Sequence, residues 1–515
     1  MQTVVIIGAG PAGLTAAYEL LKKSNKYKII VLESDSQVGG ISKTINYHNN
    51  RMDLGGHRFF SKNEEVVNFW KEIMPIQGKD SFDDKVLGRE KKLAKDGPDP
   101  DITDNTFLVR DRLSRIYYLK HFFNYPITIN WNTLKNLGFF NVLSGGFSYL
   151  KSIIFKRKET SLENFYINRF GKKLYKIFFE DYTLKVWGRH PSKISPDWGS
   201  QRAKGLSVLV VIKDWLYRLL HIKNKKKETS LIESFYYPKY GPGQFWEEVE
   251  KKILKKNGEV RKDCTVTKIN IKNKKIVSVV YKNKSKEVEL KGDIFISSMP
   301  LKDLIESFSI KIDPDIKRIA TNLPYRDFMT VGLLVKKLKL KNTTNIRTIC
   351  NIIPDCWLYV QNRDVDLGRI QIFNNWSIYM VDSPIDNIWL GLEYFCNESD
   401  DKWNMKDEDF INKAIDELVK MNIINKEDVL DSHLERVKKA YPAYFDTYNE
   451  IDKLIEYLNQ FSNLYCVGRN GQHHYNNMDH SMMTSMIAVE KIINNDKDKT
   501  EIWNVNVLGV YNEEN

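Results

Sequence analysis

The chain has 515 residues, of which 42% are hydrophobic and 28% are charged. This composition excludes a disordered tail, a collagen-like repeat and a small disulfide-stapled protein, and a chain of this length folds into two or three structural units. The 79 lysines and arginines exceed the 66 acids, which gives a net charge of +13. That excess suits an anionic small ligand or an acidic membrane surface, and charge alone does not choose between them.

The first predicted element is a strand of β-branched residues from Thr3 to Ile7. It leads into Gly8, Gly10 and Gly13, in the G-x-G-x-x-G spacing, and then into an amphipathic helix. Gly8 permits a tight turn, Gly10 lets the backbone approach a pyrophosphate, and Gly13 lets the helix pack closely on the strand. A second apolar strand ends at Glu33, where an acid accepts hydrogen bonds from an adenosine ribose. The sequence therefore predicts a dinucleotide-binding unit.

A second glycine pair, Gly39 and Gly40, follows Glu33 closely. An acid followed by such a loop is common in FAD proteins, where the loop approaches the pyrophosphate from the other side. Simple NAD proteins usually lack it. We therefore expect FAD rather than NAD.

A helical pattern dominates from about Trp131 to Lys227 and ends in a lysine run, Lys225 to Lys227, which we expect to be a solvated loop. Within this region, the stretch from Leu137 to Lys158 is first apolar and then basic. Such a stretch can lie on a membrane face. We favour the alternative, a buried segment of a helical domain with a solvated basic end.

Strand patterns return in the second half of the chain. Cys264 to Asn283 predicts a hairpin, and Gly292 to Pro300 predicts an apolar strand with a stop. Residues from about Phe328 to Phe395 alternate as β-structure, and Lys402 to Lys420 predicts a helix. The predicted fold class is α/β, with a discontinuous Rossmann-type FAD-binding domain (1–95, 230–305 and 460–495), a helical domain (130–229) and an antiparallel β-sheet substrate domain (96–129 and 306–459).

Five blocks of sequence, taken together, carry a family resemblance. In chain order they are MDLGGHRFFSKN (Met52 to Asn63), LKVWGRHPSKISPDWGSQR (Leu184 to Arg202), CWLYV with an arginine nine residues past its end (Cys356 to Arg369), AYP (Ala440 to Pro442) and GRNGQHHYNNMDHSMM (Gly468 to Met483). Their order and much of their spacing resemble the UDP-galactopyranose mutases, in particular the long, eukaryotic-type branch, within the flavin amine oxidase-like superfamily. The resemblance covers nearly the whole chain.

The resemblance implies a mutase of the isomerase class that interconverts the pyranose and furanose forms of UDP-galactose or a related nucleotide sugar for glycan biosynthesis. In that family reduced FAD is a covalent catalyst. Its N5 attacks the anomeric carbon, the nucleotide diphosphate leaves, and the flavin–sugar adduct lets the ring open and reclose. Such a site needs cations for the departing pyrophosphate and a surface that holds the sugar against the flavin. The family can bind NAD(P)H without a second glycine motif, so NAD(P)H is an open choice of reductant.

The same correspondence implies which residues form the site. Arg202, on a helical-domain segment, and Arg369, on a mobile loop, clamp the diphosphate, because the guanidinium fork pairs with phosphate oxygens bidentately. His57 runs against the flavin ring and completes the implied catalytic set. The implied substrate-binding residues are Arg112, Tyr125, Trp187, Tyr359, Tyr441 and Tyr475. The implied cofactor-binding residues are Gly8, Gly10, Gly13, Glu33, Gly39, Gly40, Gly56, Val266, Arg469 and Asp479. We expect Asp479 to cap the helix that follows it and to meet the ribitol.

Four positions depart from the long branch: Ile127, Thr128, Thr183 and Ile232. They cluster where the base and ribose of the substrate would bind. Each hydrogen-bond donor lost there costs about 1–3 kcal/mol, so the nucleotide and the sugar stay open.

Two other functions share the glycine motifs. One is a FAD-dependent oxidoreductase of the amine oxidase or protoporphyrinogen oxidase-like type. The other is a noncatalytic flavoprotein or membrane-associated scaffold. The pair Arg202 and Arg369 favours the mutase, because an oxidase of an apolar amine or a porphyrin has little need for a diphosphate clamp.

The expected partner is a nucleotide-diphosphate sugar, with no nucleic acid, since no motif beyond net charge supports one. The five scattered cysteines form no C-x-x-C pair, so we expect no bound metal and a reducing compartment. No apolar run approaches the roughly 18 residues that span a bilayer. We expect no leader peptide, because a strand-like run begins at Thr3 with no basic stretch before it. We expect a cytoplasmic protein without a transmembrane segment. A peripheral membrane contact and a homo-oligomer stay open.

Overall fold

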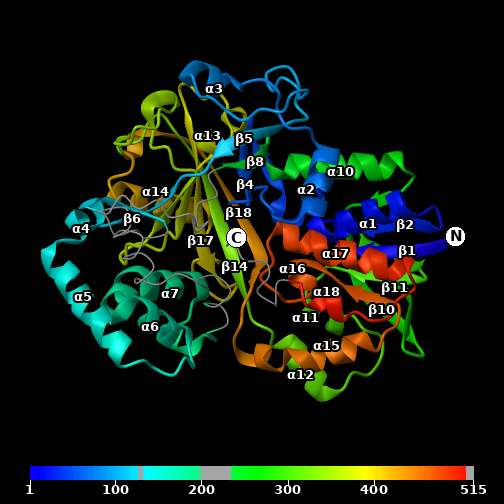
Figure 1. Cartoon of the computed structure of the whole chain (residues 1–515). Helices are drawn as coiled ribbons and strands as arrows, with labels where there is room; N and C mark the ends of the chain where they lie inside the picture. The colour runs from blue at the N-terminus through cyan, green and yellow to red at the C-terminus, as the bar shows by residue number, and fades with distance from the viewer. Residues whose placement is uncertain (126–130, 197–198, 200–233, 506–515) are drawn as a thin grey trace.

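The computed structural model describes residues 1–125, 131–196, 199 and 234–505 (Figure 1). Several residues singled out in the sequence lie outside this part of the chain: Arg202, Ile127, Thr128, Ile232 and the run Lys225 to Lys227.

A parallel five-stranded sheet organises one half of the molecule. Its strand order is β19-β13-β1-β2-β9, and its strands are β1 (Gln2–Ile7), β2 (Tyr27–Leu32), β9 (Glu259–Arg261), β13 (Ile294–Ser297) and β19 (Leu464–Cys466). Because both faces are covered, Val4 to Ile7 of β1 form a continuous apolar run and not an alternating one. Segments far apart in the sequence thus build one sheet, as the discontinuous Rossmann-type prediction requires.

Helices and a small sheet cover the two faces of the parallel sheet. On one face, the core contains side chains from α1 (Pro11–Lys23), α2 (Glu64–Ile73), α10 (Pro242–Lys255) and α17 (Met478–Ile493). On the other face lie α11 (Leu301–Glu306), α12 (Pro314–Thr321), α15 (Ile451–Asn459) and the antiparallel strands β10 (Cys264–Lys272), β11 (Lys275–Asn283) and β12 (Lys286–Lys291). The hairpin predicted over Cys264 to Asn283 is confirmed by the pairing of β10 with β11.

A seven-stranded sheet forms the opposite half, in the order β18-β14-β17-β16-β15-β6-β7. All neighbours are antiparallel except β15 and β6. The strands are β6 (Ser114–Tyr118), β7 (His121–Asn124), β14 (Tyr325–Val335), β15 (Trp357–Val360), β16 (Arg369–Ile372), β17 (Ile388–Cys396) and β18 (Val429–Pro442), and α14 (Asp407–Lys420) packs on them.

The described helical region contains α4 (Trp131–Leu137), α5 (Phe139–Ile154), α6 (Leu162–Tyr175), the π turn η2 (Lys176–Glu180) and α7 (Asp181–Trp187). Helices α5 and α6 pack closely at Gly171, whose φ is +76° and where a Cβ would lie 2.8 Å from the backbone of Tyr149. The region lies beside the seven-stranded sheet, at the edge of the molecule away from the parallel sheet (Figure 1).

Short elements complete the fold. Two small pairs are β3 (Thr44–Tyr47) with β4 (Asn50–Asp53), and β5 (Phe107–Asp111) with β8 (Ser234–Pro238). In the described part of the chain, the remaining helices are α3 (Phe82–Leu87), α13 (Phe373–Trp376), α16 (Gly468–Gly471) and α18 (Thr500–Trp503), and the 3₁₀ turns are η1 (Gly40–Ser42), η3 (Pro191–Lys193), η4 (Ile349–Asn351), η5 (Ile378–Met380), η6 (Lys426–Asp428) and η7 (Asp446–Glu450).

The predicted fold class is confirmed: a Rossmann-type sheet, a helical region and a mainly antiparallel sheet are all present. The exact domain boundaries stay a prediction. Helices α12 and α15, which we assigned to the sheet domain, contribute side chains to the core beneath the parallel sheet.

The preferred interpretation of Leu137 to Lys158 is wrong. We expected a buried segment, but α5 buries only Gly145, Tyr149 and Ser152 and exposes most of its large apolar side chains. Among the described residues, no helix combines the length and the apolar content that a membrane crossing needs.

Replacing Gly13 by alanine tests the packing of α1 on β1. A Cβ at this position would lie 1.9 Å from the carbonyl oxygen of Gly8, so the backbones must separate. We expect Gly13→Ala to lower the free energy of unfolding by about 1–3 kcal/mol, measured by urea denaturation.

Gly146→Ala is the matched control, because a Cβ there meets nothing within 4 Å on the exposed side of α5. Alanine is the better helix former by about 1 kcal/mol, so this variant should be as stable as the wild type or more so. Equal stability of Gly13→Ala and the wild type would contradict the close packing.

Candidate active site

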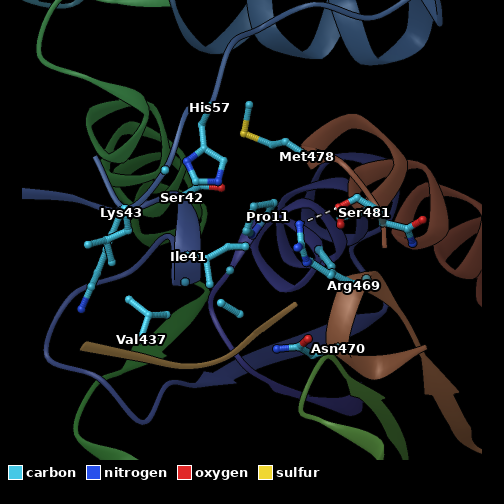
Figure 2. Close-up of a pocket in the computed structure, with 18 of the residues that line it drawn as sticks. Pro11, Ile41, Ser42, Lys43, His57, Val437, Arg469, Asn470, Met478 and Ser481 are labelled. Atoms are coloured by element: carbon cyan, nitrogen blue, oxygen red, sulfur yellow. Dashed lines mark hydrogen bonds between the residues drawn. The ribbon is translucent and has the colours of Figure 1, made fainter. Parts of the chain in front are cut away.

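A cavity of about 940 Å³ lies between the two halves of the molecule, at the upper end of the roughly 300–1,000 Å³ typical of small-ligand sites. Figure 2 shows part of its wall, with Pro11 from α1, Val437 from β18 and Met478 from α17. Most of the predicted site residues line it: Gly8, Gly10, Glu33, Gly40, Gly56, His57, Arg112, Tyr125, Val266, Tyr359, Arg369, Tyr441, Arg469, Tyr475 and Asp479. The cavity thus brings together residues that are far apart in the sequence.

Two glycine loops meet at one end of the cavity. Gly8 turns the chain from β1 into α1 with a φ of +97°, and the N–H of Gly39 donates to the carbonyl of Ala9 over 2.9 Å. The loops touch, since a Cβ on Gly40 would lie 3.3 Å from the Cα of Gly10. Gly10 is the N-cap residue of α1 and has no side chain to cap the helix. The first-turn N–H groups are therefore suited to bind a phosphate. Gly13 and Gly39 lie behind this surface and shape it.

Glu33 directly follows β2 and lies beside the first glycine loop. One carboxylate oxygen accepts the N–H of Ala9 over 2.6 Å, and the other accepts the N–H of Asp35 over 2.9 Å. These backbone contacts fix the carboxylate at the cavity wall, where a carboxylate suits the ribose hydroxyls of a dinucleotide.

Asp479 does not cap the last long helix, contrary to our prediction. The N-cap of α17 is Asn477, in a capping box with His480. Asp479 lies in the first turn, where a negative charge is favourable to the helix dipole, and its carboxylate accepts a hydrogen bond from Ser61 over 3.0 Å. It lines the cavity, so its proposed contact with the cofactor does not depend on capping.

His57 extends from the GGH loop into the space near Pro11 and Met478 (Figure 2). The loop lies tightly against Trp357, because a Cβ on Gly56 would be 2.3 Å from the indole ring. Burial, followed by the charges of Arg469 and Arg369, lowers the pKa of His57 to about 3. The ring is therefore neutral at physiological pH.

Arg369 is the first residue of β16, and its cross-strand neighbours are Tyr359 on β15 and Glu393 on β17. Its Nε lies 2.5 Å from the Glu393 carboxylate, and its Nη2 donates to the hydroxyl of Tyr441 over 2.8 Å. Burial disfavours the charge, but Glu393 and then Tyr441 raise the pKa of Arg369 above its usual range. The guanidinium is thus a fixed cation.

Arg469 supplies a second guanidinium to the same wall. It lies 4.1 Å from the ring centre of Tyr475 and 4.9 Å from that of Tyr441, as cation–π contacts. Among the described residues, its Nε and Nη2 are buried and have no hydrogen-bond partner. Because buried donors are normally satisfied, these atoms point to an acceptor supplied by a ligand.

Aromatic rings form the rest of the substrate side. Tyr441 and Tyr475 stack with ring centres 5.7 Å apart, and Tyr125 lies 4.6 Å from Tyr359. Burial raises the pKa of Tyr441 to about 12, so its hydroxyl stays protonated. Trp187 does not line the cavity, although we expected it in the substrate pocket. It is buried behind the wall and contacts Tyr475 edge-on at 6.4 Å.

The loop between β15 and β16 is held from two sides, although we expected Arg369 on a mobile loop. Lys185 of α7 donates to the carbonyls of Asn362 and Leu367, and Glu417 of α14 accepts the N–H groups of Asp366 and Leu367. Burial lowers the pKa of Lys185 to about 8. The backbone that leads into Arg369 is therefore anchored.

Sequence reasoning missed Glu393 and Lys185. Glu393 had a usable signal, because it is the one acid in the apolar strand IWLGLEYFC, and a buried acid needs a cationic partner. Lys185 had none, since its partners are backbone carbonyls about 180 residues away.

Comparison with known proteins agrees with this architecture. Residues 6–73 match the family model of the NAD(P)-binding Rossmann-like domain. The whole chain is similar to the solved structure of a reduced UDP-galactopyranose mutase, with a TM-score of 0.77, 20% identity and 99% coverage of each chain. It is also similar to a candidate protoporphyrinogen oxidase of Exiguobacterium sp. (TM-score 0.63, 14% identity, 95% of this chain and 98% of that chain). A putrescine oxidase variant is also similar to this chain (TM-score 0.57, 11% identity, 96% of this chain and 99% of that chain). Likeness at these identities shows a shared fold.

Acid sensitivity tests the burial of His57, which lines the cavity, and of His473 and His474, which precede the cavity residue Tyr475 in the chain. Burial lowers the pKa of His57 and His473 to about 3 and that of His474 to about 4. The unfolded chain therefore binds more protons than the folded one below about pH 6.5, and stability is lost as pH falls. Each such histidine contributes a slope of about 1.4 kcal/mol per pH unit.

The variant His473→Gln isolates one of these contributions. The glutamine amide can replace the ring nitrogen that donates to the carbonyl of Ala443 over 3.1 Å. Urea denaturation across about pH 6.5 to 4 should show a shallower loss of stability in the variant. Identical slopes would mean that His473 is protonated in the folded state.

Proposed function

We propose that the chain is a FAD-dependent nucleotide-sugar mutase that interconverts pyranose and furanose forms, with UDP-galactose or a related nucleotide sugar as substrate. The observation that carries this proposal is a single cavity that is lined both by the dinucleotide loops and by two guanidinium groups, those of Arg369 and Arg469. A reaction in which a nucleotide diphosphate departs and returns beside a flavin needs a site for the dinucleotide cofactor and cations for the diphosphate. This cavity is suited to both tasks.

The residues present fit FAD. The touching glycine loops leave backbone N–H groups for a pyrophosphate, and Glu33 is fixed for a ribose. Arg469 keeps buried donors for an acceptor, and Val266 and Asp479 line the same cavity. When bound, reduced FAD supplies the nucleophile and NAD(P)H is a suitable source of its electrons.

The substrate side would act mainly by electrostatics. Arg369, held by Glu393 and Tyr441, needs no reorganisation to stabilise charge that grows on the leaving diphosphate. We assign Arg202 to the same diphosphate on the strength of the family resemblance. Arg112, Tyr125, Tyr359 and Tyr475 would position the nucleotide and the sugar. His57, being neutral, would contact the flavin without adding a third charge.

The oxidoreductase alternative is less well supported. An amine substrate binds as a cation or becomes one, and Arg369 and Arg469 would repel it. The five cysteines are free, which fits the cytoplasmic compartment that we propose.

Turnover by the purified protein tests the proposed function. Flavin-loaded protein, chemically reduced and mixed with a panel of nucleotide sugars, should interconvert pyranose and furanose products, which are separated by chromatography. We expect activity only with reduced flavin and no stoichiometric use of reductant, because the nucleophile is regenerated in each cycle. One equivalent of reductant or oxygen consumed per turnover would favour the oxidoreductase.

Substitution of the arginines tests the anion site. Arg369→Ala and Arg202→Ala should each lower kcat/KM by a factor equivalent to about 2–4 kcal/mol, with unchanged FAD content. Arg369→Lys should recover only part, because a point charge cannot form the bidentate fork.

Two further variants make this test specific. Arg318→Ala removes an exposed guanidinium on α12, which is paired with Asp315 of the same helix and with Glu450 of η7, and should leave activity unchanged. Arg369→Met combined with Glu393→Gln avoids an unpaired buried carboxylate. Full activity of this double variant would contradict the role of Arg369.

A further inference from the structure

Helix α5 presents an apolar face that the rest of the described chain does not cover. Six of its exposed large side chains are Phe139 (71% exposed), Phe140 (85%), Leu143 (45%), Phe147 (71%), Leu150 (57%) and Ile154 (72%), and we call this set the α5 face; Ile153 (37%) lies beside it. At 100° per residue, these six positions fall within an arc of about 100°. They form one stripe and not a scatter of single exposed residues.

The opposite side of α5 holds the helix in place. Gly145, Tyr149 and Ser152 are buried, and Tyr149 meets α6 at Gly171. The α5 face is therefore on the side of the helix away from these buried residues. Helix α5 itself lies at the outer edge of the molecule (Figure 1). A contiguous exposed apolar stripe of this kind marks an interaction surface.

Positive charge borders the α5 face. Lys151 is exposed on the helix, and Phe155, which is 68% exposed, is followed directly by Lys156, Arg157 and Lys158. Within the described chain, Lys151, Lys156 and Lys158 form no ion pair. The nearby acid, Glu159, is paired with Arg169 over 2.7 Å. The border of the face is thus cationic without local compensation.

We propose that the α5 face docks on an anionic lipid bilayer surface. A helix with aromatic and aliphatic side chains on one face, bordered by lysine and arginine, lies in the membrane interface with its apolar side among the acyl chains. Anionic headgroups then meet Lys151, Lys156 and Lys158. A second copy of this chain carries the same positive border and would be repelled by it. This docking is independent of the chemistry of the cavity.

Vesicle flotation of the flavin-loaded, full-length protein tests the proposal. We expect the wild type to float with vesicles of phosphatidylcholine and phosphatidylserine, to float less with phosphatidylcholine alone, and to be released by salt. Phe140→Ser combined with Phe147→Ser should weaken binding at least about tenfold. Lys156→Glu combined with Lys158→Glu should lower the affinity for vesicles that contain phosphatidylserine by at least about fivefold per substituted lysine, which removes the preference for this lipid.

Ile102→Ser is the matched control, because Ile102 is 83% exposed and lies outside the α5 face. It should float like the wild type, and thermal unfolding should show that all variants are folded. Failure of the wild type to float, or equal flotation of the Phe140/Phe147 variant, would overturn the proposal. The proposal would also be overturned if the wild type did not float and light scattering showed that it is a dimer, which the substitutions of Phe140 and Phe147 separate into monomers.

Discussion

The site depends on an imbalance of buried charge. Arg369 and Arg469 share one cavity wall, and Glu393 is the carboxylate in contact with Arg369. A buried charge is costly unless it is paired and hydrogen-bonded. Glu393 and Tyr441 compensate the charge of Arg369. Arg469 contacts aromatic faces and one backbone carbonyl, and two of its N–H donor atoms stay without a hydrogen-bond partner among the described residues. The wall is therefore stabilised further when an anion enters.

The fold creates this imbalance through the meeting of two sheets. The parallel sheet brings the glycine loops and Glu33 to one side of the cavity. In the other sheet, register aligns Tyr359, Arg369 and Glu393 on three adjacent strands, so their spacing is set by the strand separation and not by flexible side chains. Lys185 and Glu417 hold the loop before Arg369. An anchored cation suits stabilisation of charge that develops during a reaction.

Local pattern was sufficient to predict the Rossmann unit, because Gly8, Gly10, Gly13 and Glu33 act within one stretch of chain. Most implied site residues do line one cavity. The predictions that proved wrong concern features that tertiary contacts determine. The cap of α17 is Asn477 because the helix begins at Met478, two residues earlier than the motif suggested. The apolar stretch of α5 is exposed because Gly145 and Tyr149, not the phenylalanines, face α6. Hydrophobic content alone cannot say which side a fold leaves uncovered.

The central claim is that excess positive charge in the cavity binds a diphosphate. Calorimetric titration of the flavin-loaded protein with uridine, UMP and UDP tests it most directly, because the three ligands differ only in phosphate charge. The account predicts that affinity rises along this series, on the order of tenfold or more per phosphate, since each adds charge-assisted hydrogen bonds. Equal affinity for uridine and UDP would contradict it.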